Sequence, residues 1–172
     1  MPGTNFYRLL TDPEYKQVFR LRLKAGNPWI AFFYKLRLLP LLGMGKQIML
    51  LTTLGRKSGK LRDTPIGYYR IDGQVYVFSG WGRDTNWFQN IEAHPDQVDV
   101  QIGFKRDHAH AEIVDEPREA LQLLESFVVQ NPKGAQMLMG WDPLQDDVRK
   151  ADFSFMIERM LIVRFRFGED YS

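Results

Sequence analysis

A chain of 172 residues suits one domain, and a domain of this size buries enough surface to fold without disulfides or structural metals. It contains no cysteine, which excludes a disulfide framework, a thiolate nucleophile and any cysteine metal site. Arg8, Asp12 and Glu14 come early and no clean apolar core follows them, so we find no signal-peptide pattern and expect a cytoplasmic protein.

The charge is divided unevenly along the chain, although the net charge is only +2. Residues 1–62 hold 12 of the 23 Lys and Arg but 2 of the 21 Asp and Glu, a net of +10, and the remainder carries a net of −8. Such an asymmetry indicates an anionic partner: a phosphate-rich cofactor, a membrane surface or a nucleic acid. We disfavour nucleic acid, because Trp29, Phe32 and Phe33 fall in an apolar helical stretch and not on a basic strand face.

Two helices are predicted at the start of the chain. Residues 13–25 form a basic helix with Pro13 in its first turn, and Gly26-Asn27-Pro28 breaks it. Residues 28–39 form a second helix that ends at Pro40. This second run is too short and too interrupted by charge to span a membrane.

Two interpretations of this N-terminal segment stay open. In the one we favour, residues 1–45 pack on the domain formed by residues 46–172 and keep a basic face in solvent. In the other, residues 13–42 lie in a membrane interface, as their mixture of aromatic and basic side chains suggests.

The rest of the chain alternates short strands with peripheral helices. Period-two patterns and turn signals predict six strands, at residues 47–53, 65–71, 74–79, 98–104, 109–114 and 160–167. Helical patterns predict helices at residues 84–93, 116–129, 134–139 and 143–150. Asp72-Gly73 is a strong hairpin signal, and regular strand–helix–strand crossovers are missing from the pattern. The predicted class is therefore α+β, mainly β: a mostly antiparallel, six-stranded barrel with helices around it.

The most informative stretch is a basic glycine loop between two predicted strands, Gly55-Arg56-Lys57-Ser58-Gly59-Lys60-Leu61-Arg62. Gly55 and Gly59 permit positive φ and are expected to turn amide N–H groups outward as an anion nest. Arg56 and Arg62 can each hold a phosphate or carboxylate through two N–H groups. The spacing of the glycines differs from that of a P-loop. The alternative is an ordinary solvated hairpin loop.

A second segment, Ser79-Gly80-Trp81-Gly82, follows a predicted strand. Its glycines would let a flat ligand approach the backbone and stack on the indole. The helix after it carries Trp87 and Asn90 and offers unpaired N–H groups at its N-terminus. The alternative is a plain strand-to-helix turn with Trp87 in the core.

These two segments together resemble the deazaflavin-dependent nitroreductase family of the flavin/deazaflavin oxidoreductases. The resemblance covers residues 47–114 and rests on pieces in matching order and spacing: Leu51 to Gly59, Arg62, Thr64-Pro65-Ile66, Asp72-Gly73, Ser79, Gly80, Gly82, Trp87, Asn90, Ala93, His94-Pro95 and Val98–Gly103. It implies a split β-barrel like that of the pyridoxamine-phosphate oxidases, often dimeric, that binds reduced coenzyme F420. Hydride would pass to an electron-poor small molecule, such as an activated alkene, a quinone or a nitroarene.

The resemblance also implies a cofactor site with three parts. The glycine loop would hold the phosphate and oligoglutamate tail, Pro65 and Ile66 would line the ring, and the second segment with Trp87 would close over it. The complete set of implied cofactor residues is Gly55, Arg56, Lys57, Ser58, Gly59, Arg62, Thr64, Pro65, Ile66, Ser79, Gly80, Trp81, Gly82, Trp87 and Asn90.

Gly80 departs from the family pattern, because many relatives carry a lysine after the serine that Ser79 matches. With one phosphate-binding cation fewer, FMN bound by a reductase of the same fold stays an alternative. A flavin or lipid carrier without turnover is the rival outside the enzymes.

No acid–base dyad stands out in the sequence. Tyr68 or Tyr69 could donate a proton to the acceptor, and at most one is expected to face the site, because neighbours on a strand face opposite sides. His108 and His110 share a strand face but have no third ligand at a clear spacing, so no metal site is predicted.

Overall fold

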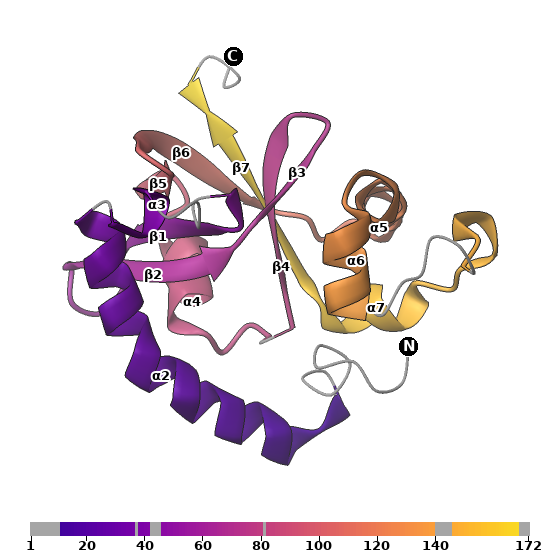
Figure 1. Cartoon of the computed structure of the whole chain (residues 1–172), viewed down its shortest axis with the longest axis horizontal. Helices are drawn as coiled ribbons and strands as arrows, with labels where there is room; N and C mark the ends of the chain where they lie inside the picture. The colour runs from indigo at the N-terminus through magenta and orange to yellow at the C-terminus, as the bar shows by residue number, and fades with distance from the viewer. Residues whose placement is uncertain (1–10, 37, 42–45, 81, 140–145, 169–172) are drawn as a thin grey trace.

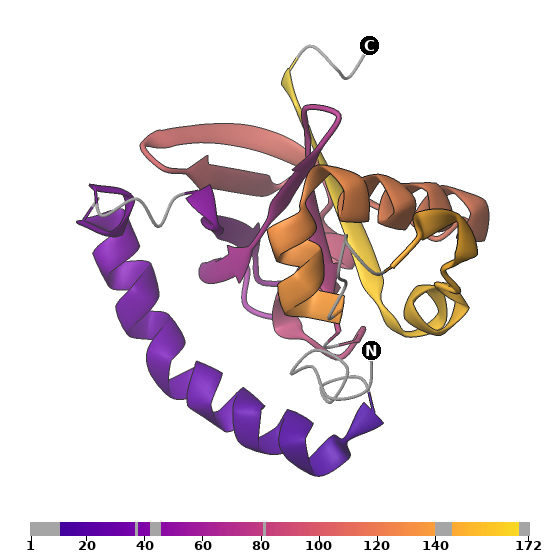
Figure 2. The same ribbon diagram turned by 45° about the vertical axis from the view of Figure 1, so that its right-hand side comes forward.

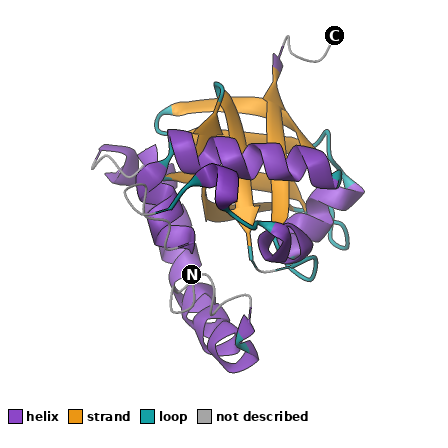
Figure 3. Ribbon diagram, turned by 90° about the vertical axis from the view of Figure 1, so that its right-hand side faces the viewer, coloured by secondary structure: helices purple, strands orange, loops and turns teal. Residues whose placement is uncertain are grey.

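The computed structural model describes residues 11–36, 38–41, 46–80, 82–139 and 146–168. Its centre is a seven-stranded antiparallel sheet, which curls on itself with helices around it (Figures 1 and 3). The strands are β1 (Ile48–Leu54), β2 (Leu61–Gly67), β3 (Tyr69–Ile71), β4 (Gln74–Ser79), β5 (Val98–Ile102), β6 (Lys105–Ile113) and β7 (Leu161–Phe167), in the spatial order β2-β1-β5-β6-β7-β4-β3. The predicted α+β class with a curled antiparallel sheet is confirmed.

The predicted count of six strands is wrong, because the run over residues 65–71 is two strands. β2 begins earlier, at Leu61, and the bond from Tyr68 N–H to Gln47 O at 3.2 Å is the last of its pairing with β1. The run is divided at Tyr68, and β3 begins at Tyr69. Before this break the chain pairs with β1, and after it with β4. β2 and β3 therefore form the two edges of the sheet order although one residue separates them.

The hairpin between β3 and β4 follows the predicted turn. Asp72 and Gly73 both adopt positive φ, 50° and 81°, which a two-residue hairpin turn requires at both central positions. Gln130 of helix α5 (Pro117–Gln130) fastens this turn, since its side chain accepts from Asp72 N–H at 3.0 Å and donates to the Asp72 carboxylate at 2.7 Å.

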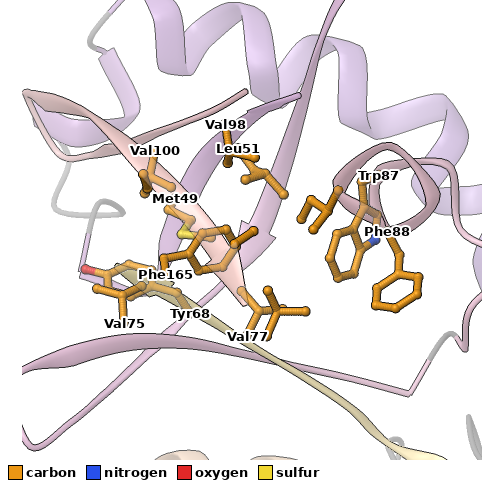
Figure 4. Close-up of a cluster of buried hydrophobic side chains, with 14 of the residues drawn as sticks. Met49, Leu51, Tyr68, Val75, Val77, Trp87, Phe88, Val98, Val100 and Phe165 are labelled. Carbon is orange, nitrogen blue, oxygen red and sulfur yellow. The ribbon is translucent and has the colours of Figure 1, made fainter. Parts of the chain in front are cut away.

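Two apolar cores lie against the sheet. The first fills its curl, where strand side chains such as Met49, Val77 and Phe165 point toward one another (Figure 4). Trp87 and Phe88 of helix α4 (Asn86–Ala93) pack against the same cluster. The second core joins β3 and β4 to α5, and each large side chain buried in either core contributes about 1.5–3 kcal/mol.

Helix α2 (Pro13–Lys35) is continuous, so the predicted break at residues 26–28 is wrong. Asp12 caps its N-terminus by accepting from Tyr15 N–H at 2.9 Å, and Pro13 occupies the first turn as expected. Pro28 removes only one N–H group from the hydrogen bonds of the helix, and the turns on either side of it remain helical. The helix accommodates the proline along a bowed path at the periphery of the molecule (Figures 1 and 2).

The remaining helices are short and decorate the sheet: α3 (Leu38–Leu41), α6 (Pro132–Met139), the 3₁₀ turn η2 (Val148–Lys150) and α7 (Ser154–Arg159). The helix predicted over residues 143–150 begins outside the described residues, and its described part is only the turn η2. Helix α7 was not predicted. Across the described parts of the chain, no helix is both long and apolar enough to cross a bilayer.

Candidate functional site

The glycine loop is a tight turn between β1 and β2. Gly55 O accepts from the backbone N–H groups of Ser58 and Gly59 at 3.0 and 2.8 Å, and Gly55 N–H donates to Lys60 O at 2.9 Å. Gly59 has the expected positive φ of 60°, but Gly55 does not, and it is a glycine for another reason. A Cβ on Gly55 would lie 2.8 Å from Ser58 Oγ and 3.0 Å from Lys60 O, so there is no room for one.

The expected anion nest is therefore wrong. The amides of Gly55, Ser58 and Gly59 close the turn upon itself, and Arg56 N–H donates to the side chain of Asn90. The backbone N–H groups of Gly55, Arg56, Ser58 and Gly59 are thus engaged within the protein.

Asn90 of α4 fixes the loop to the barrel. Its buried side chain accepts from Arg56 N–H at 3.1 Å and donates to Thr53 Oγ1 at 3.1 Å. The Arg56 guanidinium also donates to Asn90 Oδ1 at 3.3 Å and to Asn86 Oδ1 at 3.5 Å. Asn86 is the first residue of α4, and its N-cap Thr85 makes no side-chain capping bond. The guanidinium is thus held beside a helix N-terminus, which favours anions.

The other cations of the loop point outward. Lys57, Lys60 and Arg62 are exposed, and within the described residues none of them forms an ion pair. Ser58 is exposed as well, with its hydroxyl 3.4 Å from Lys60 N. The loop thus presents three unpaired positive charges next to the anchored Arg56.

Strand β2 carries Thr64, Pro65 and Ile66, all half-buried. Ile66 packs against the core inside the curl. Because successive side chains on a strand alternate, Pro65 faces the other side of β2 together with Asp63. Asp63 accepts from Thr52 Oγ1 at 2.7 Å and forms an ion pair with Lys35 of α2.

The second segment lies where β4 turns toward α4. Ser79 and Gly80 are buried, Gly82 has a positive φ of 75°, and Trp81 lies outside the described residues. Lys16 of α2 reaches this turn: its Nζ would lie 4.0 Å from a Cβ on Gly82. The start of α2 therefore brings a cation beside the predicted cofactor segment, which the sequence did not indicate.

Trp87 is 7% exposed and belongs to the core. Its ring meets Phe88 edge-on at 5.8 Å between centroids. Its contact with a cofactor ring stays a prediction, and the observed surroundings of Trp87 are those of a core residue.

The model of the F420H(2)-dependent quinone reductase family matches residues 39–142, more than half of the chain. The chain belongs to this family. It is thus an oxidoreductase that uses coenzyme F420, as its resemblance to the deazaflavin enzymes led us to expect.

Solved structures with related folds include a structure described as an F420-H2 dependent reductase (FDR-A). It is 25% identical to this reductase, and the match covers 70% of this chain and 95% of that one with a TM-score of 0.47. A conserved hypothetical protein from Mycobacterium tuberculosis is 18% identical over 74% and 80% of the two chains, with a TM-score of 0.50. An FAD-binding protein from Mesorhizobium loti is 20% identical over 72% and 82%, with a TM-score of 0.45.

A cavity of roughly 400 Å³ opens beyond the end of β2 in this reductase. Its walls come from β3, α6 and the segments around them: Lys46, Gln47, Tyr68, Tyr69, Arg70, Asn131, Lys133 and Gly134. We call it the tyrosine cavity. Its lining combines two tyrosines with the basic residues Lys46, Arg70 and Lys133.

Both predicted tyrosines line this cavity. Their side chains pack into different cores: Tyr68 belongs to the core inside the curl, and Tyr69 packs against the core formed with α5. Burial raises the pKa of Tyr68, with Arg70 opposing the shift, and raises the pKa of Tyr69 to about 12. Both phenols therefore stay protonated at neutral pH.

The histidine pair of β6 has other partners in the reductase. His108 Nδ1 lies 3.0 Å from Asp99 Oδ1, and His110 Nδ1 lies 2.6 Å from Asp96 Oδ1. Hydrogen bonds from His108 and Arg106 outweigh the effect of burial and lower the pKa of Asp99. In the described part of the chain, three or more metal-ligating side chains do not gather at any one point.

Proposed function

We propose that the chain reduces an activated alkene, a quinone or a nitroarene with reduced F420 whose anionic end is held by the glycine loop. The observation that carries this proposal is the Arg56 guanidinium, fixed by Asn86 and Asn90 at the first turn of α4. A guanidinium and a helix N-terminus both favour anions, and the three exposed cations of the loop add to them. Phosphate and carboxylate groups of the cofactor would bind there.

Lys16 could replace the positive charge that many relatives carry on a lysine at the position of Gly80. Gly80 offers no charge, but the Lys16 ammonium lies beside Gly82 in the same turn. The Lys16 ammonium would supply a cation for the phosphate of the cofactor in place of the missing lysine.

The tyrosine cavity fits an acceptor with oxygen atoms. β2 joins it to the glycine loop, and from Arg62 to Tyr68 the chain runs about 20 Å at the rise of an extended strand. The bound cofactor supplies the hydride. Tyr68 and Tyr69 would donate hydrogen bonds to a carbonyl or nitro oxygen of the acceptor.

The charges around the cavity suit the same reaction. Lys46, Arg70 and Lys133 line it, and cations near an oxygen that gains electron density stabilise the developing negative charge. Arg70 also donates to Gly73 O at 3.4 Å, which holds its guanidinium at the base of the hairpin.

The test is a fluorescence titration with reduced F420, followed by turnover with a soluble quinone. Arg56→Ala should weaken F420 binding by about 10- to 100-fold, the value of a lost charge-assisted hydrogen bond. Arg118→Ala, which removes an exposed arginine from α5, is the matched control and should bind F420 as the wild type does. Equal affinity of the Arg56→Ala and Arg118→Ala variants would remove the loop from the site.

A further inference from the structure

We propose that the outer face of α2 and α3 binds the surface of an anionic lipid bilayer. This inference is independent of the cofactor chemistry. It rests on three properties of the N-terminal helices: an exposed apolar stripe, an opposite face that is already occupied, and a strong positive charge.

The apolar stripe consists of large side chains that protein would normally bury. Leu21 is 62% exposed, Trp29 65% and Leu41 74%. Val18, Phe32, Phe33, Leu36 and Leu38 are exposed as well. The residue spacings of three, four and seven put the members within α2 on one side of the helix. Large apolar side chains exposed together on one side of a helix mark an interaction surface.

The other side of α2 holds the helix to the barrel. Ala31 and Tyr34 are buried against Leu50, and the Lys35 ammonium pairs with Asp63 of β2. At the opposite end, Lys16 reaches the turn at Gly82. The apolar stripe therefore faces away from the body of the protein, as the peripheral position of α2 in Figures 1 and 2 indicates.

The aromatic members of the stripe gather at one place. Trp29 and Phe33 stack at 6.3 Å between ring centroids, and Phe32 meets Phe33 edge-on at 5.6 Å. Tryptophan and phenylalanine on the apolar side of a basic helix are typical of helices that lie in the headgroup region of a bilayer. At a rise of about 1.5 Å per residue, α2 offers about 35 Å of helix to lie along the surface.

The positive charge of the N-terminal helices favours an anionic lipid surface, and not a second copy of the chain, as the partner of the stripe. Residues 13–41 contain six Lys and Arg and one Glu, and four of the six basic residues are left when Lys16 and Lys35, which face the body of the protein, are set aside. Two such helices packed stripe to stripe would bring like charges together, whereas anionic headgroups neutralise them. Each basic residue near an anionic membrane surface adds to the attraction, so apolar burial and charge act in the same direction.

The experiment is co-sedimentation of the full chain with vesicles of phosphatidylglycerol and phosphatidylcholine, and with phosphatidylcholine alone. The wild type should bind the anionic vesicles, and its binding should weaken in high salt. The double variant Trp29→Ala/Phe32→Ala should bind them at least about tenfold more weakly, since it removes two exposed aromatic side chains that the bilayer would bury. Phe104→Ala, which removes a 55% exposed aromatic from the β5–β6 turn, is the matched control and should bind as the wild type does.

Two further measurements separate the outcomes. The tryptophan emission of the wild type should shift to the blue on adding anionic vesicles, and Trp29→Phe should abolish most of that shift while F420 binding is kept. Absence of wild-type sedimentation, or equal binding by the double variant, overturns the proposal. A wild-type dimer that the double variant dissociates, without vesicle binding, assigns the stripe to a second copy instead.

Discussion

Gly55 shows how a single missing side chain shapes the candidate site. Its backbone O receives two turn hydrogen bonds, and its N–H donates across the loop to Lys60 O. The space that a Cβ would need is taken by Ser58 Oγ and by this same carbonyl. Because a backbone carbonyl cannot rotate away as a side chain can, the turn would have to open to admit alanine.

We therefore expect Gly55→Ala to destabilise the protein by about 1–3 kcal/mol, the usual cost of overpacking. Gly67→Ala is the control, since a Cβ there would lie 3.8 Å from Gln47 O, an ordinary contact. Urea unfolding of both variants measures the difference. A Gly55→Ala variant as stable as Gly67→Ala would show that the loop adapts at no cost.

The raised pKa of Tyr69 makes the free energy of unfolding depend on pH in the alkaline range. Burial raises its pKa to about 12 in the folded chain, whereas a tyrosine in an unfolded chain titrates near pH 10. Its contribution to stability is therefore complete below about pH 10, and it is lost as the pH rises from about 10 to about 12, because the unfolded chain ionises first.

Tyr69→Phe should remove this dependence. We expect the unfolding free energy of the wild type, minus that of Tyr69→Phe, to be constant up to about pH 10 and to fall above it. Unfolding curves at several alkaline pH values measure it, and the titrations of the other tyrosines cancel in the difference. A difference that stays constant throughout would mean that Tyr69 ionises as readily folded as unfolded.

Among the elements, α2 depends on a single buried tyrosine for its attachment near the C-terminal end. Tyr34 is fully buried, and its hydroxyl donates to Ile48 O at 2.9 Å and accepts from Gly103 N–H at 3.0 Å. These bonds tie the helix to β1 and to the turn after β5. The neighbouring Lys35–Asp63 ion pair is more exposed, with 53% of the lysine side chain accessible.

Tyr34→Phe should cost about 1–3 kcal/mol, because it removes the hydroxyl that bonds the half-buried backbone groups Ile48 O and Gly103 N–H. Lys35→Ala should cost at most about 1 kcal/mol, since exposed ion pairs contribute little. Thermal or urea unfolding of the two variants measures both values. If Lys35→Ala proved the more damaging change, electrostatics and not the buried hydroxyl would hold α2 in position.

At the scale of the whole molecule, the predictions that succeeded rest on contiguous residues. The Asp72-Gly73 turn, the glycine loop between strands and the helix after the second segment each follow from a few neighbouring residues whose conformational preferences agree. The family resemblance rests on the same contiguous pieces.

The predictions that failed depend on residues far apart in the chain. The strand is divided at Tyr68 because the chain changes its pairing partner there from β1 to β4, and the anchor of Arg56 lies 34 residues away at Asn90. Lys16 and Gly82 approach each other only because α2 continues through Pro28. Local propensity carries no information on such contacts, so the sequence indicated the loop but not what holds it.

The position of β7 has a consequence for biosynthesis. This last strand lies between β6 and β4, so the segments β2-β1-β5-β6 and β4-β3 share no strand pairing until it arrives. On the ribosome, the two halves of the sheet cannot join through strand pairing until Leu161–Phe167 has been synthesised. A stop codon ahead of Leu161 would leave two unjoined β-layers with bare edges, a substrate for chaperones and proteases.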